Sequence, residues 1–187
     1  GSLQGSFADF PSLWSAWLGT DFRRHRRIHE KTEAFEVNAV SGACLMARRE
    51  VLQTVGYMDE SYKFFAEEVD WCYRIRKAGW RIRWLPTAQV VHFLGQSRKS
   101  RPWFAYLHIH RSRLLFFRKH YGPVQARILW LGYIGVATLK LMGASGGSLL
   151  HRGNELRARL AQNRNLLRWL LLEEDVFRSR GQAETDC

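Results

Sequence analysis

The 187-residue sequence predicts an α/β domain that is followed by long helices. Two observations lead to this prediction. Between residues 37 and 93, short β-prone runs alternate with helix-like segments that end at glycine. Past Pro102, apolar residues recur at helical spacing over most of the remaining chain. Apolar residues make up 46% of the sequence, as expected of a folded protein.

The first 36 residues give weaker signals. Trp14, Trp17 and Leu18 lie at helix-like spacing after Pro11 and predict one short helix. Residues 21–36 are densely charged and predict an exposed loop or helix.

The segment from Val37 predicts strands and a short helix. The runs "VNAV" and "SGACLMA" predict two strands, separated by a tight backbone at Ser41-Gly42. The run "RREVLQTVG" predicts a short helix that ends at Gly56. An aromatic-rich loop, "YMDESYKFF", is expected to follow.

The best-supported helix, "EEVDWCYRIRKAG", begins with three carboxylates, Glu67, Glu68 and Asp70. Negative charge in a first turn complements the helix dipole, and Asp70 can pair with Arg74 four residues on. Gly79 is placed to end the helix. Apolar surroundings or a neighbouring carboxylate raise the pKa of a carboxyl group, and a general base needs a raised pKa. A structural and a catalytic interpretation therefore both stay open.

The next runs predict two more strands and three helices. "WRIRWLP" alternates like a half-buried strand that stops at Pro86, and "AQVVHF" predicts a strand that ends at His92. "LGQSRKSRP" predicts a basic loop. Helices are expected over "WFAYLHIHRSRLLFFRKHYG", over "VQARILWLGYIGVATLKLM", and from about Asn154 to Arg178.

Positive charge dominates the second half of the chain. The formal net charge is +12, and fifteen Lys or Arg residues but no Asp or Glu lie between Trp71 and Asn154. Such a field favours an anionic partner, whether nucleic acid, phosphorylated substrate or acidic lipid, although a solvated basic face would also explain it. We expect no nucleic-acid partner, because no helix-turn-helix, zinc or RRM signature is present.

The apolar stretch Ile128–Met142 is a candidate membrane-binding segment. It is shorter than the ~20 residues that a span needs, and Lys140 interrupts it. We predict a helix that lies in the membrane interface, with basic residues on both sides of it, Arg127 and Arg152 among them. A soluble helix buried against the domain is the alternative.

From Val37 to Tyr121, the order of these motifs resembles the C-terminal half of the catalytic domain of family 2 glycosyltransferases, of the rhamnosyltransferase-like type found in bacterial cell-wall and O-antigen assembly. The resemblance implies the acceptor side of a GT-A fold with an incomplete sheet, because the family's Asp-x-Asp motif is absent before Val37. It divides the chain into a truncated remnant or connecting segment (1–36), an acceptor-side half (37–121) and a basic, apolar membrane-associating tail (122–187).

The same resemblance implies roles for individual residues. These enzymes invert the anomeric carbon: a carboxylate deprotonates the acceptor hydroxyl, and a divalent metal stabilises the departing nucleoside diphosphate. Glu68 stands at the position of the base, with Asp70 as the second catalytic candidate. His92 matches a strand-end metal ligand for Mg or Mn, in a site that this chain holds only in part. The other implied site residues are the acceptor-binding Ser41, Gly42, Ala43, Glu67 and Trp71, and the donor diphosphate-binding Gly95, Ser97, Arg98 and Lys99.

The implied activity is transfer of a sugar from a nucleotide-diphospho-sugar, with dTDP-rhamnose as the leading donor, to a lipid-linked or polysaccharide acceptor in cell-envelope glycan synthesis. We expect a peripheral protein on the cytoplasmic face of the bacterial inner membrane, against anionic lipid. Cys44, Cys72 and Cys187 fit no disulfide or metal spacing, in line with a reducing compartment. The isolated chain is expected to be inactive, or nearly so, and the alternative is a non-catalytic membrane-associated module that retains the acceptor-side fold.

Overall fold

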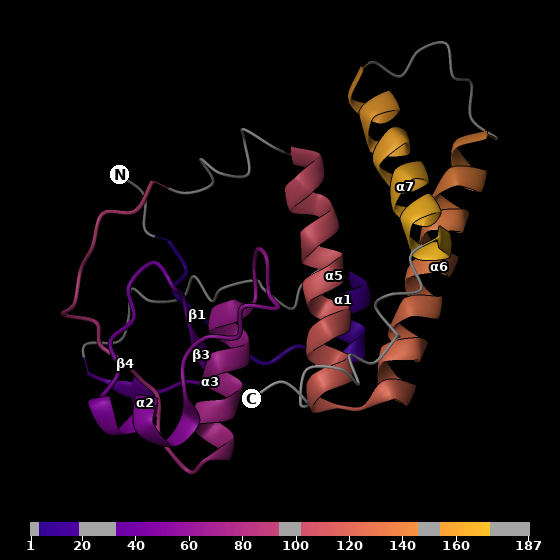
Figure 1. Ribbon diagram of the computed structural model, residues 1–187. Coiled ribbons are helices and arrows are strands. Elements are labelled where there is room, and N and C mark those ends of the chain that lie inside the picture. Colours follow the sequence, from indigo (N-terminus) through magenta and orange to yellow (C-terminus); the bar gives the residue numbers. More distant parts are fainter. Residues whose placement is uncertain (1–3, 19–32, 94–101, 146–153, 173–187) are drawn as a thin grey trace. The chain divides into compact units, whose positions relative to one another are not determined.

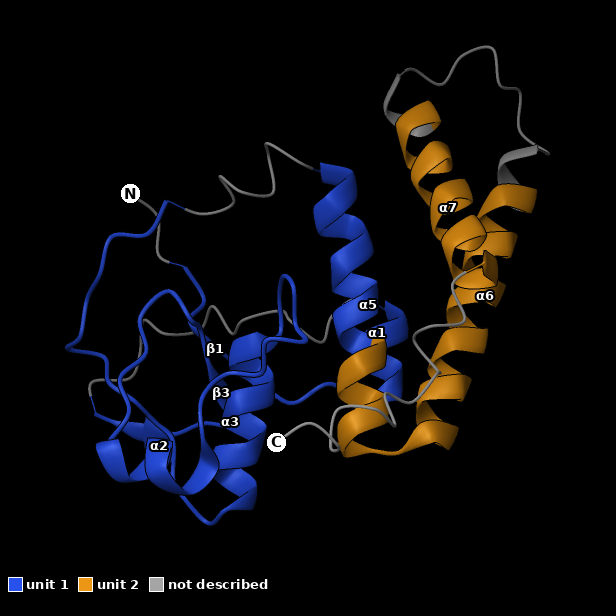
Figure 2. Cartoon of the chain, in the orientation of Figure 1, with its two compact units in different colours: residues 1–113 blue, residues 114–187 orange. Residues whose placement is uncertain are grey.

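A computed structural model describes residues 4–18, 33–93, 102–145 and 154–172 of the chain (Figure 1). The chain divides into two compact units, Gly1–Arg113 and Leu114–Cys187, and the boundary falls inside one long helix (Figure 2). The elements in chain order are β1 (Phe7–Ala8), α1 (Leu13–Leu18), β2 (Phe35–Glu36), β3 (Ala39–Val40), α2 (Arg49–Val55), α3 (Glu67–Lys77), β4 (Arg83–Trp84), α5 (Pro102–His120), α6 (Pro123–Ser145) and α7 (Asn154–Leu172).

Two short antiparallel ladders form the β-structure of the first unit. β1 pairs with β3, with Phe7 opposite Val40, and β2 pairs with β4, with Phe35 opposite Trp84. Helix α3 packs against β3 (Figure 1). β1 comes from the first 36 residues, so that segment contributes to the same unit as the acidic helix.

The core of this unit lies between the ladders and the helices α2 and α3. Its buried members are Val37, Ala39, Val51, Trp71, Cys72, Ile75 and Ile82. An aromatic group packs against this core, because the ring of Phe7 lies 5.3 Å from that of Phe35 and 5.8 Å from that of Trp84. These contacts hold the two ladders together by burial of apolar surface.

Glycines end helices α2 and α3, as the sequence predicts. Gly56 has a positive φ of 77° and its N–H donates to the carbonyl of Leu52, which ends α2. After α3, Gly79 has φ 86°, and the N–H of Trp80 donates to the carbonyl of Ile75 at 3.1 Å. This pair of features is a Schellman motif, in which glycine adopts the left-handed conformation without steric cost.

The helix predictions are confirmed and part of the strand predictions is wrong. α1, α2, α3, α5 and α6 form where helices were expected, and α7 is described from Asn154 as far as Leu172. In "WRIRWLP" only Arg83–Trp84 pairs as a strand, although Ile82 is buried as the alternation predicts. The two strands expected at 41–47 and 88–93 are absent from these described residues. Residues 88–93 are exposed throughout and pair with no other described strand.

The second unit is built from the end of α5 and the hairpin of α6 and α7 (Figure 2). The side chains buried on these two helices are Ala126, Leu129, Tyr133, Ala137, Leu166, Trp169 and Leu170. The indole N–H of Trp130 donates to the carbonyl of Leu170 at 3.1 Å, which ties the two helices together. In the part of the chain that the structure describes, no helix has the length and hydropathy of a transmembrane span.

Candidate active site

The first turn of α3 faces the loop that follows β3. Gly42 lies so close to Glu68 that a Cβ atom added to the glycine would stand 3.5 Å from the Cβ of Glu68. A small pocket of about 40 Å³ opens beside them, and its lining includes Ser41, Phe65 and Glu68. The structure therefore brings together three of the predicted site residues, Ser41, Gly42 and Glu68.

Ser41 shapes the loop on this side of the pocket. The residue is buried, and its N–H donates to the carbonyl of Ser6 at 2.8 Å. Its hydroxyl accepts a hydrogen bond from the N–H of Ala43 at 3.3 Å, which closes the turn over the exposed Gly42. Small residues in this turn leave room for a ligand to approach Glu68.

A kink in the backbone sets the position of the acidic turn. Phe65 and Ala66 have φ values of 66° and 68°, and a left-handed conformation costs a non-glycine residue ~1–2 kcal/mol. The carbonyl of Ala66 accepts the first helical hydrogen bond, from the N–H of Asp70 at 2.9 Å. No side chain caps this helix end, so the carboxylates of the first turn supply the negative charge that complements its dipole.

Helix α5 contacts the loop that precedes α3 and contains the kink at Phe65-Ala66. The buried hydroxyl of Ser112 donates to the carbonyl of Phe64 at 2.9 Å, and the guanidinium of Arg111 donates to the carbonyl of Ser61 at 3.0 Å. The ring of Phe64 lies 5.7 Å from that of Phe104 on the same helix. These contacts stabilise the strained backbone just before Glu67 and Glu68.

Asp70 lies on the opposite side of the helix from Glu68, and its contacts are those of a residue that stabilises the fold. It is fully buried, and its carboxylate accepts hydrogen bonds from the hydroxyl of Tyr62 at 3.2 Å and from Nε of Arg74 at 2.8 Å. The same guanidinium donates to the carbonyls of Val55 and Tyr57 at 2.8 and 2.6 Å. Burial, and then the negative charge of Asp70, raise the pKa of Tyr62, so its hydroxyl stays a donor.

Glu67 and Glu68 are only partly buried, and the Oε2 atom of each is shielded from solvent. Trp71 does not line the small pocket. It is 5% exposed, belongs to the core, and donates its indole N–H to the carbonyl of Gly56 at 2.8 Å. Burial raises the pKa of Cys72, on the same helix, to about 11, and the charge of Glu68 adds to this rise.

His92 lies on the exposed segment after β4. Its Nδ1 atom is 3.2 Å from Oε1 of Gln4, and Nε2 of Gln4 donates to its carbonyl at 2.9 Å. Among the described residues, no three His, Cys, Asp or Glu side chains gather as a metal site would require. His92 alone does not fit a metal site, and its predicted role as a ligand stays a prediction. Gly95, Ser97, Arg98 and Lys99 lie outside the described residues.

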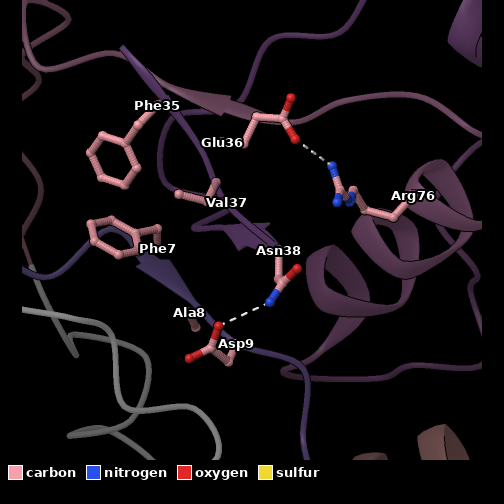
Figure 3. Close-up of a pocket in the computed structure, with 8 residues that line it drawn as sticks. All are labelled: Phe7, Ala8, Asp9, Phe35, Glu36, Val37, Asn38 and Arg76. Atoms are coloured by element: carbon pink, nitrogen blue, oxygen red, sulfur yellow. Dashed lines mark hydrogen bonds and ion pairs between the residues drawn. The ribbon is translucent and has the colours of Figure 1, made fainter. Parts of the chain in front are cut away.

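A larger pocket of about 160 Å³ opens between β1, β2 and α3 (Figure 3). Its polar side chains contact one another: Asn38 donates to Asp9 at 2.9 Å, and Arg76 pairs with Glu36 at 3.1 Å. None of the predicted site residues lines this pocket. The small pocket at Glu68 is therefore the better candidate for chemistry.

Sequence reasoning did not find Tyr62, the kink at Phe65-Ala66, or Ser112. Ser112 stands between Arg111 and Arg113, so the local sequence does not mark it as buried, although a buried hydroxyl needs a hydrogen-bond partner. The identity of that partner depends on a loop 48 positions earlier in the chain, which no local pattern reveals.

The described residues thus define an α/β domain with carboxylates at a helix start beside a small pocket. The family model described as "Glycosyltransferase like family 2" matches residues 4–113, and the chain belongs to this family.

The chain is 31% identical over 127 residues to the N-acetylglucosaminyl-diphospho-decaprenol L-rhamnosyltransferase of Mycobacterium tuberculosis, an alignment that covers 67% of this chain and 41% of that relative. It is 30% identical over 56 residues to the low-salt glycan biosynthesis hexosyltransferase Agl10 of Haloferax volcanii, which covers 30% of this chain and 18% of the relative. The chain therefore spans less than half the length of these proteins. No solved structure matches it significantly.

Proposed function

We propose that this chain takes part in transfer of a sugar from a nucleotide-diphospho-sugar to a lipid-linked or polysaccharide acceptor, with inversion, as the acceptor side of a GT-A fold. Family membership supports the reaction class. Rhamnose is the sugar that we favour, since the mycobacterial relative is named an L-rhamnosyltransferase. The name of that relative also specifies a diphospho-decaprenol compound, which supports a lipid-linked acceptor.

The observation that carries the proposal is the contrast between two carboxylates of one helix turn. Asp70 is fully buried and bonded to Arg74 and Tyr62. Glu68 instead borders the small pocket beside Gly42, where an acceptor hydroxyl can approach it. A general base must lie within hydrogen-bond reach of the proton that it removes, and Glu68 meets this requirement better than Asp70.

In the proposed reaction, the acceptor hydroxyl oxygen forms a bond to the anomeric carbon of the donor sugar. The bond from that carbon to the diphosphate oxygen breaks, and the nucleoside diphosphate leaves with the bonding electrons. Glu68 takes the hydroxyl proton. Because the acceptor attacks from the side opposite the leaving group, the configuration at the anomeric carbon is inverted.

The test is Glu68→Gln in the protein that contains this chain, assayed for transfer of rhamnose from dTDP-rhamnose to polyprenol-diphosphate-linked N-acetylglucosamine. We expect turnover to fall by a factor of about 10²–10⁴, the usual contribution of a general base. Glu60→Gln, an exposed carboxylate in the preceding loop, is the matched control and should leave turnover unchanged. Undiminished transfer by Glu68→Gln would favour the non-catalytic module, and a wild-type protein that transfers only another sugar would overturn the choice of rhamnose.

A further inference from the structure

Helix α6 has apolar side chains on two opposite faces. One face carries the buried residues Ala126, Leu129, Tyr133 and Ala137, on the helix that packs against α7. The opposite face carries what we call the outer stripe: Val124, Ile128, Leu131, Leu139 and Met142. These residues are separated by four, three, eight and three positions, which places them on one side of a helix.

The outer stripe is exposed along the whole helix. Its side chains have exposed fractions between 40% for Ile128 and 70% for Val124. Apolar side chains scattered singly on a surface need no explanation, but five on one side of a helix, in two groups separated by Gly135, indicate a surface that binds something.

The charged residues of α6 itself have one sign. From Pro123 to Ser145 the sequence has no Asp or Glu, and its basic residues are Arg127 and Lys140. Glu155 is the single acidic residue of α7, which has four arginines.

We propose that the outer stripe of α6 lies in the surface of an anionic membrane, with the helix parallel to the bilayer. A helix that exposes an apolar stripe and carries only basic charges can lie in the interface of an anionic membrane, and α6 has both features. Anionic lipid headgroups complement the basic residues of α6, which has no acidic residue, and the acyl chains accept the stripe.

A second copy of the chain fits this face less well. Pairing two outer stripes would bring two acid-free, basic helices together, and like charges across an interface oppose association. The charge pattern therefore selects lipid as the occupant.

The test is flotation of the full chain with vesicles of phosphatidylcholine alone, or of phosphatidylcholine and phosphatidylglycerol in equal parts. We expect binding to the anionic vesicles that weakens in high salt, and weaker binding to the neutral ones. In the double variant Leu131→Gln and Leu139→Gln, the partition coefficient should fall about hundredfold, roughly tenfold for each leucine withdrawn from lipid. Both positions are exposed, so the variant should keep its far-UV circular dichroism.

The matched control is the double variant Leu85→Gln and Val91→Gln, which changes two exposed apolar residues of the first unit and should bind like the wild type. Equal binding of the two double variants would overturn the proposal. A wild-type chain that ignores vesicles and dimerises, with the dimer lost in the α6 variant, would assign the stripe to a second copy instead. A monomeric chain that ignores vesicles would also overturn it. No sugar substrate enters the assay, so these outcomes are independent of the proposed transfer reaction.

Discussion

Replacing Asp70 with asparagine removes the charge of a fully buried carboxylate. In the wild-type chain, Oδ2 accepts a hydrogen bond from Nε of Arg74 at 2.8 Å, and Oδ1 accepts one from the hydroxyl of Tyr62 at 3.2 Å. Asparagine can keep one of these hydrogen bonds. At the other position its amide nitrogen and the donor would face each other, which leaves a buried donor without an acceptor.

The size of the effect follows from this geometry. A hydrogen bond to a charged group contributes ~1.5–3 kcal/mol, and breaking a buried ion pair by removing one partner costs ~3–5 kcal/mol. The side chain of Arg74 is 20% exposed, so water compensates part of the loss. Its bonds to the carbonyls of Val55 and Tyr57 hold the guanidinium in place. We therefore expect the free energy of unfolding to fall by about 2–4 kcal/mol.

Urea unfolding followed by tryptophan fluorescence measures this change. Glu60→Gln is the control, because it removes an exposed carboxylate from the preceding loop and should change the free energy of unfolding by less than about 0.5 kcal/mol. If Asp70→Asn unfolded at the same urea concentration as Glu60→Gln, the carboxylate of Asp70 would not be a structural anchor. It would then compete with Glu68 for the role of base.

Two further predictions concern the same unit. Ser112→Ala removes the hydrogen bond to the carbonyl of Phe64, so the free energy of unfolding should fall by ~1–2 kcal/mol. Amide hydrogen exchange in residues 62–66 should become faster. The control Ser61→Ala, at an exposed position, should change neither quantity. Cys72 has a pKa raised from 9.0 to about 11 by burial, so the unfolded chain loses this proton at lower pH than the folded chain. Stability should be intact below pH 9 and fall as the pH rises to about 11, by up to ~3 kcal/mol in urea titrations. Cys72→Ala should reduce that fall in stability. The further loss of stability above pH 10, which the raised pKa of Tyr62 predicts, should remain. An unchanged pH profile would contradict the assignment to Cys72.

The helices could be predicted because their causes lie within a few residues. The positive φ values of Gly56 and Gly79 end α2 and α3, and each needs only a glycine at the right place. A strand depends on a partner far along the chain. The β-prone segment 88–93 pairs with no other described strand, and Val91 and Phe93 are 88% and 76% exposed. Its composition predicted a strand, but composition cannot supply a partner.

The candidate site could be predicted in part. Three carboxylates at a helix start indicated the position, and the separation of four residues predicted the pair of Asp70 and Arg74. The left-handed Phe65 and Ala66 carry no sequence signal, because neither residue type favours that conformation. The kink is held by contacts with α5 that join residues nearly 50 positions apart, so it appears only in the folded chain.

Helix geometry explains why neighbouring carboxylates of one turn have different environments. Successive residues of an α-helix are about 100° apart, so Glu68 and Asp70 point to nearly opposite sides. One side faces the Gly42 loop and the small pocket, and the other faces Tyr62 and Arg74. A single turn can therefore hold a reactive carboxylate on one side and an anchoring carboxylate on the other. The anchor also fixes the rotation of the helix, because a turn about its axis that moved Glu68 away from Gly42 would pull Asp70 from its two donors. Under the proposed mechanism, in which Glu68 is the base, a substitution at Asp70 would therefore lower sugar transfer through the position of Glu68.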